Sequence, residues 1–186
     1  LRAGERILIH SAAGGTGLAC VQLALSKGAI VYATIGKPYK REILVGLGVH
    51  RVIVREEEDF ALVIREEIST VDVIIDGMSG AIIEAGLSVL ASGGRYVEIA
   101  AGEVIDRPLI DPKELFLKGH SFHGVNLSYA LQDEEVFVRL AERLQELLAN
   151  GIITPQVHQH FSFTDIEKAI QLLRSGKTIG KVVLSK

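Results

Sequence analysis

Short apolar runs alternate along this chain with stretches whose apolar residues recur at helical spacing. Residues 7–9 form the first apolar run, followed by the glycine-rich turn SAAGGTG and by GLACVQLALSKG, which has the apolar period of a helix. The pattern predicts a strand, a tight turn and a helix. Further strands are expected at AIVYATI, RVIV, VDVIID, GGRYVEIAA and SFHGVNL, and further helices at KPYKREILVGLG, residues 60–68, a segment through Leu90, and residues 113–117.

Such an alternation of short apolar strands with helices is typical of a parallel sheet covered by helices. Six strands in this order predict an α/β protein with a doubly wound parallel sheet, the Rossmann fold. From Glu134 a long amphipathic helix carries leucines on one face and is expected to end at Asn150.

That helix divides the chain into two parts. We predict a nucleotide-binding domain over residues 1–150 and a C-terminal appendage over residues 151–186. Within the appendage we expect a strand at VHQHFSF, a helix capped by Thr164, and a last strand at GKVVLS.

Composition narrows the class of protein. The 186 residues are 48% hydrophobic and 23% charged with a net charge of −3, so the chain should fold and offers no basic field for nucleic acid. No apolar run approaches the roughly 20 residues that cross a bilayer, and LRAGERILIH does not read as a signal peptide. Because the single Cys20 cannot form an internal disulfide, we expect a soluble protein in the reducing cytoplasm.

The turn after the first strand carries a dinucleotide-binding pattern. Gly14 and Gly17 stand at the second and third glycine positions of that fingerprint, with Ala12 at the first. Gly14 would let the backbone approach a pyrophosphate, Gly17 would let the helix pack closely on the strand, and the helix N-terminus would bind the phosphates. Many tight turns are glycine-rich, but the strand-turn-helix context favours the cofactor interpretation.

The end of the second strand indicates which cofactor is used. An NAD site usually carries an acidic residue there, whereas this chain has Thr34 followed by Lys37, Lys40 and Arg41. These cations could hold a 2′-phosphate, which favours NADPH over NADH. The alternative is that they only solvate a helix start, although the helix dipole disfavours basic residues at that end.

The segments HSAAGGTGLACVQLA, LGVHRVI, VDVIIDGMSG, GGRYVEIA and SGKTIGKVVLS together resemble the quinone oxidoreductase branch of the medium-chain dehydrogenases/reductases. FHGVNL and GKTIGKVVL are similar to the enoyl reductase domains of type I polyketide synthases and animal-type fatty acid synthase. The resemblance covers essentially the whole chain. It implies a zinc-independent reductase whose preceding catalytic subdomain is absent here, with residues 151–186 returning to that subdomain.

By this resemblance, the glycine turn, the cations after the second strand, and the turns after the fourth and fifth strands hold NADPH. The expected cofactor-binding residues are Ala12, Ala13, Gly14, Gly15, Thr16, Gly17, Thr34, Lys37, Lys40, Arg41, Arg55, Asp76, Gly77, Met78, Ala100 and Ala101. Synthase enoyl reductases carry a lysine and an acid at positions that read Ala101 and Ser128 here. The proton must therefore come from another donor or from water, or else the domain is impaired.

Several histidines are weaker candidates. His120 and His123 flank Phe122 on the sixth strand, where we expect them to share one face and where they could supply a proton, although strand histidines more often make structural hydrogen bonds. His158 and His160 lack further ligands at useful spacing, so no metal site is predicted. Cys20 is expected to pack in the core.

The leading functional hypothesis is NADPH-dependent reduction of an enoyl thioester carried on an acyl carrier protein, beside other synthase domains. The alternatives are a free-standing quinone or alkenal reductase, and a scaffold domain that has lost catalysis. The apolar edge of the sixth strand also allows a homodimer in which two sheets join.

Overall fold

The first strand is an apolar segment buried on both of its faces. In β1 (Arg6–Ile9), the side chains of Ile7, Leu8 and Ile9 are at most 1% exposed. Continuous burial of this kind is expected for a central strand of a parallel sheet, since helices cover both faces. The neighbours of β1 are β2 (Ile30–Ile35) and β4 (Val71–Asp76), and both pair with it in parallel.

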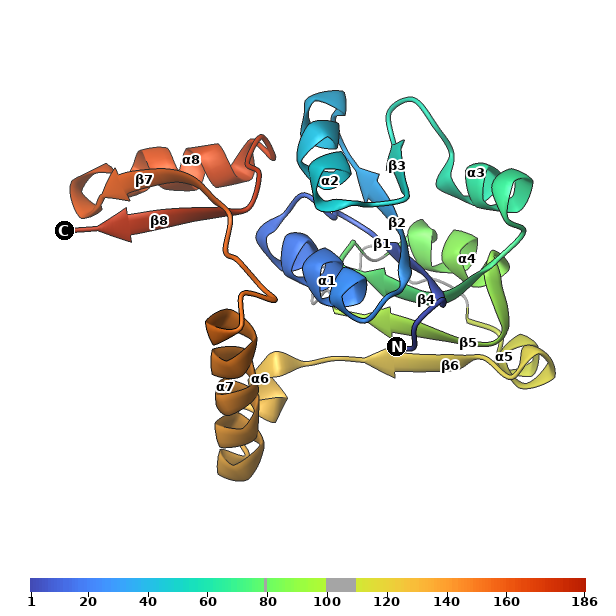
Figure 1. Cartoon of the computed structure of the whole chain (residues 1–186). Coiled ribbons are helices and arrows are strands. Elements are labelled where there is room, and N and C mark those ends of the chain that lie inside the picture. Colours follow the sequence, from blue (N-terminus) through green and yellow to red (C-terminus); the bar gives the residue numbers. More distant parts are fainter. Residues whose placement is uncertain (79, 100–109) are drawn as a thin grey trace.

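A computed structural model describes residues 1–78, 80–99 and 110–186, with the backbone alone at Ala130. Within these residues six strands form one parallel sheet in the order β3-β2-β1-β4-β5-β6 (Figure 1). The chain thus winds outward from β1 in both directions, which confirms the predicted doubly wound sheet. The remaining strands of this sheet are β3 (Arg51–Val54), β5 (Leu90–Glu98) and β6 (Ser121–Gly124).

Helices cover the two faces of the sheet and enclose two apolar clusters. On one face, α1 (Gly15–Ser26) and α2 (Arg41–Leu47) pack on the sheet through residues such as Leu18 and Leu44. On the other face, α3 (Phe60–Glu67) and α4 (Ala81–Ser88) contribute Phe60 and Ile83. Between β2 and α2 lies the short 3-10 helix η1 (Pro38–Lys40).

The remaining elements follow the fifth strand. They are α5 (Pro112–Lys118), α6 (Leu127–Ala130), α7 (Glu134–Ala149), β7 (Val157–Ser162), η2 (Phe163–Asp165), α8 (Ile166–Arg174) and β8 (Lys181–Ser185). β7 and β8 form a separate two-stranded parallel sheet, which Figure 1 shows together with α8 at one end of the molecule. None of the described helices is both long and apolar enough to cross a membrane.

The structure corrects two predicted boundaries. The helix expected through Leu90 ends at Ser88, because Leu90 pairs with Val71 in the sheet. Thr164 does not cap the last helix: it lies in η2, where Ser162 accepts the Thr164 backbone N–H, and α8 begins after Asp165. In the second case the short helix η2 separates β7 from α8, which moves the start of α8 to the residue after Asp165.

Candidate functional site

The glycine-rich turn joins the buried end of β1 directly to α1. Gly17 allows this close approach, because a Cβ there would lie 2.5 Å from the Ser11 carbonyl oxygen and 2.6 Å from the Ala12 Cα. Gly14 is the N-cap of α1 and supplies no side-chain hydrogen bond to the first turn. The positive end of the helix dipole is therefore open to an anion.

A crevice of about 280 Å³ opens at this turn, between the carboxyl ends of β1 and β4. These two strands lie where the sheet order reverses, which is the usual ligand site of a doubly wound sheet. Glycine backbone forms much of the wall, as close approach of a diphosphate requires. The lining residues are Ile9, His10, Ser11, Gly14, Gly15, Thr16, Gly17, Cys20, Ile75, Gly77 and Ile99.

A larger pocket of about 510 Å³ shares Ser11 and Gly14 with the crevice. It combines cationic side chains from η1 and from the ends of β2 and β3 with a turn of the C-terminal segment. Its lining residues are Ser11, Ala13, Gly14, Ile35, Gly36, Lys37, Lys40, Arg55, Glu56, Ser175, Gly176 and Thr178. The larger pocket therefore places three cationic side chains beside the glycine-lined crevice, and cations of this kind can pair with phosphate groups.

The cations of the larger pocket differ in their partners. Lys37 pairs with Glu56, which raises the pKa of Lys37, but both side chains are about half exposed, at 54% and 51%, so the pair is readily opened. Lys40 Nζ donates to the Gly176 carbonyl oxygen at 2.5 Å and has no ion pair within the described residues. Burial lowers the pKa of Lys40 and also that of Arg55.

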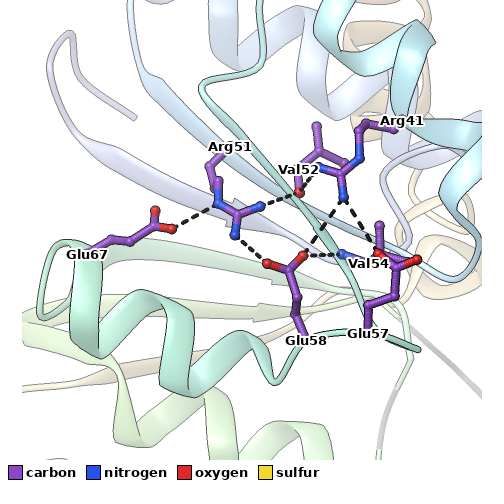
Figure 2. Close-up of polar contacts among 7 residues, drawn as sticks. All are labelled: Arg41, Arg51, Val52, Val54, Glu57, Glu58 and Glu67. Atoms are coloured by element: carbon purple, nitrogen blue, oxygen red, sulfur yellow. Dashed lines mark hydrogen bonds and ion pairs between the residues drawn. The ribbon is translucent and has the colours of Figure 1, made fainter.

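Arg41 lies elsewhere, although the sequence grouped it with these lysines. Figure 2 shows its guanidinium reaching across β3 to the Val52 carbonyl oxygen, which accepts from Nη1 at 3.0 Å. Arg41 Nη2 also lies 3.9 Å from Glu57 and 4.0 Å from Glu58, and Glu58 pairs with Arg51 in turn. Arg41 ties α2 to β3 and is not among the described residues that line the larger pocket.

A turn of the C-terminal segment closes the larger pocket, which the sequence analysis missed. The Gly180 N–H donates to the Ala13 carbonyl at 2.9 Å, and Tyr39 Oη donates to the Lys177 carbonyl at 3.1 Å. Gly180 has φ +75°, and a Cβ there would lie 2.2 Å from the Gln156 carbonyl oxygen. The paired glycines of SGKTIGK were the available signal for this docking turn.

Some expected contact residues are instead buried beneath the site. Ala12, Thr34 and Asp76 have no exposed surface. Asp76 accepts the Met78 N–H at 2.8 Å and the Tyr96 hydroxyl at 2.7 Å. Asp76 therefore shapes the turn that carries Gly77 into the crevice, whereas its own carboxylate faces the core. Burial, followed by the hydrogen bond to Asp76, raises the pKa of Tyr96.

The histidine candidates are not brought together. His120 precedes β6, and its even-numbered position and the odd-numbered position of His123 fall on opposite faces of an extended chain, so the expectation of a shared face was wrong. His123 lines an apolar hollow beside Ile7 and Val73 rather than either pocket of the site. Burial lowers the pKa of His120.

Of the two positions where, by the family resemblance, synthase enoyl reductases carry ionisable groups, the structure describes one. Ser128 lies on the exposed helix α6, whereas Ala100 and Ala101 lie outside the described residues.

In the C-terminal segment, His158 Nδ1 accepts the Ile179 N–H at 3.4 Å. Within the described part of the chain, no three His, Cys, Asp or Glu side chains are grouped to hold a metal ion. Cys20 packs against the apolar cluster beneath α1, and burial raises its pKa.

A family model described as zinc-binding dehydrogenase matches residues 47–184. The chain is 37% identical over 188 residues to a phenolphthiocerol/phthiocerol polyketide synthase of Mycobacterium tuberculosis. It is 35% identical over 191 residues to the highly reducing polyketide synthase 40 of Fusarium pseudograminearum. All of this chain is covered in both matches, but it spans only 8% and 7% of those proteins.

Solved structures show the same similarity in three dimensions. The CurK enoyl reductase is 33% identical to this chain with a TM-score of 0.85, and the match covers 100% of this chain and 55% of that one. The Escherichia coli quinone oxidoreductase, solved in complex with NADPH, is 26% identical with a TM-score of 0.85, covering 100% and 58%. The chain thus spans little more than half of each solved reductase.

Proposed function

The chain belongs to the zinc-binding dehydrogenase family of the medium-chain dehydrogenases/reductases, a family of oxidoreductases, and on that premise we propose that it is the NADPH-binding part of an enoyl reductase. The substrate class is an α,β-unsaturated thioester, carried in a synthase on an acyl carrier protein. Its polyketide synthase relatives and the CurK enoyl reductase support this assignment.

One observation carries the choice of cofactor: the cationic pocket continues directly from the glycine-lined crevice. Lys37, Lys40 and Arg55 line that pocket. β2 ends at Ile35 and is followed by Gly36, so its end carries no acid to hold a ribose 2′-hydroxyl. Glu56 is the acid in the pocket, but it follows β3 and pairs with Lys37. This arrangement favours a phosphate on the adenosine ribose, and hence NADPH.

The chain's own residues bind and orient the cofactor. Gly14 and Gly17 allow the backbone of the turn and α1 to approach the diphosphate, and Lys40 and Arg55 receive the 2′-phosphate. When bound, NADPH would supply the hydride that reduces the β-carbon of the thioester, with a proton added at the α-carbon. Ser128 stands where, by the family resemblance, synthase enoyl reductases carry an acid, so another donor or water would supply that proton.

The second candidate is reduction of a quinone or alkenal by a free-standing enzyme. The Escherichia coli quinone oxidoreductase favours it, because its TM-score to this chain equals that of the CurK enoyl reductase. A third candidate, a scaffold that binds cofactor without catalysis, is favoured by Ala101 and Ser128 at the positions of the family's ionisable groups.

The test is NADPH oxidation by the whole gene product that contains this chain, supplied in turn with an enoyl thioester and a quinone. We expect the thioester to accelerate oxidation more than the quinone does. Acceleration by the quinone alone would replace this proposal with the second candidate. If neither substrate accelerates oxidation, the double variant Ala101→Lys/Ser128→Asp is tested in the same way. Recovered activity would show that only the proton donor had been lost. Continued inactivity would indicate a domain without reductase activity.

A further inference from the structure

A row of four polar side chains crosses the sheet: three of them are buried, and the fourth, Arg55, lines the cationic pocket. In the sheet, Ile9 of β1 pairs with Ala33 of β2 and with Ile75 of β4. The residue that follows each of these three positions is polar: His10, Thr34 and Asp76. They therefore stand at one level on neighbouring strands, and Arg55 extends the row beyond β3. We call Arg55, Thr34, His10 and Asp76 the polar row. Thr34 and Asp76 have no exposed surface, and His10 is 3% exposed.

Thr34 links Arg55 to His10 within the row. Its hydroxyl oxygen accepts from Arg55 Nη1 at 3.1 Å and lies 3.0 Å from His10 Nδ1. Because a guanidinium can only donate, the Thr34 proton is left free to be donated to Nδ1. Burial, the largest effect, lowers the pKa of His10 to about 4, against the attraction of Asp76, so the imidazole is neutral at pH 7 and can accept that proton.

Arg55 is held at one end of its guanidinium. Arg55 Nη1 donates to the Thr34 hydroxyl, and Arg55 Nη2 lies beside Gly36. A Cβ added to Gly36 would lie 3.4 Å from Nη2. Arg55 has no ion pair in the part of the chain that the structure describes; burial lowers its pKa, against the nearby charge of Asp76. A guanidinium held in one orientation loses less freedom when it binds a phosphate than a mobile one does.

We propose that Thr34, supported by His10, is a positioning residue that orients Arg55 toward the 2′-phosphate and so determines the preference for NADPH over NADH. Thr34 is fully buried and cannot touch the ligand itself. Any effect of its hydroxyl on cofactor choice therefore passes through Arg55. The inference rests on the proposed function, because it assumes that the phosphate of NADPH occupies the larger pocket.

The experiment measures dissociation constants of NADPH and NADH for the 186-residue chain and for Thr34→Val, which replaces the hydroxyl with a methyl group of similar size. We expect NADPH affinity to fall roughly fivefold to tenfold, the usual effect of one ordinary intramolecular hydrogen bond, because the hydroxyl orients Arg55 without touching the phosphate, while NADH affinity stays within about twofold. Thr34→Ser, which retains the hydroxyl, should restore the preference. If Thr34→Val does not fold, Thr34→Ala is measured in the same way.

A double-mutant cycle with Arg55→Gln identifies the route of the effect. If Thr34 acts through Arg55, Thr34→Val should change the NADPH-to-NADH ratio little once Arg55 is gone. An additive loss in the double variant, or an unchanged ratio in Thr34→Val, overturns the inference. A parent chain that binds both cofactors equally overturns the proposed function as well, so the two failures are distinguishable.

Discussion

At the residue scale, the sequence located the cations of the site but not their directions. Lys37 and Lys40 were predicted from their position after the second strand, and both line the larger pocket. Arg41 follows them directly, yet it begins α2 and its side chain projects across β3. The short helix η1 separates the directions of Lys37 and Arg41, because the chain turns between them. The periodicity of the sequence does not predict the direction of a side chain after such a turn.

Buried His10 predicts a loss of stability in mild acid. Its pKa is lowered from 6.5 to about 4 in the folded chain, so the unfolded chain binds the extra proton between these values. The contribution of His10 is therefore complete above pH 6.5 and is lost as the pH falls toward 4, by on the order of 3 kcal/mol. Denaturant unfolding at pH 7 and pH 4.5 measures this loss.

Comparison with His10→Asn isolates the effect, because Glu5 and Glu58 also have lowered pKa values and lose stability in acid. The variant should start less stable at pH 7 and lose less between the two pH values. His160→Asn, at an exposed position, serves as the matched control. Equal losses in the parent and in His10→Asn would show that the buried imidazole does not control the acid response.

At the element scale, strands and helices followed from apolar spacing, whereas the docking of the C-terminal segment did not. β1, α1 and the turn between them are specified by local sequence, because burial and glycine positions agree. The turn at Gly176 reaches the site across more than a hundred residues, through the bond from Lys40. Contacts of that kind depend on how two finished units pack, which no local pattern encodes.

This docking turn gives a prediction for Gly180. Gly180→Ala places a Cβ 2.2 Å from the Gln156 carbonyl oxygen, so the turn must shift and loosen one wall of the cationic pocket. We expect a lower unfolding temperature and NADPH affinity reduced several-fold. Gly151→Ala is the matched control: its φ of +65° costs about 1–2 kcal/mol in the same way, but its Cβ meets nothing within 4 Å.

The two variants should therefore share the backbone strain and differ in the displacement of the turn. Calorimetric titration with NADPH, together with thermal unfolding, compares them directly. Equal NADPH affinities for Gly180→Ala and Gly151→Ala would mean that the docked turn adds nothing to cofactor binding.

At the scale of the whole molecule, the doubly wound sheet was predictable because six short strand-like segments alternate with helices. The reaction was less accessible, since the chain spans only 55% of the CurK enoyl reductase. The proposed cofactor site, in contrast, is assembled from described residues of this chain. Cofactor binding and turnover should accordingly separate, with binding retained by the 186-residue chain alone.

The most direct measurement is calorimetric titration of the 186-residue chain with NADPH and with NADH under the same conditions. The cationic pocket predicts that NADPH binds at least about tenfold more tightly, as one charge-assisted phosphate contact would provide. Lys37→Glu should weaken or reverse this preference, and Arg41→Glu, which changes a cation outside the pocket, should leave it intact. Equal affinities of the parent chain for NADPH and NADH would contradict the assignment of the pocket to a 2′-phosphate.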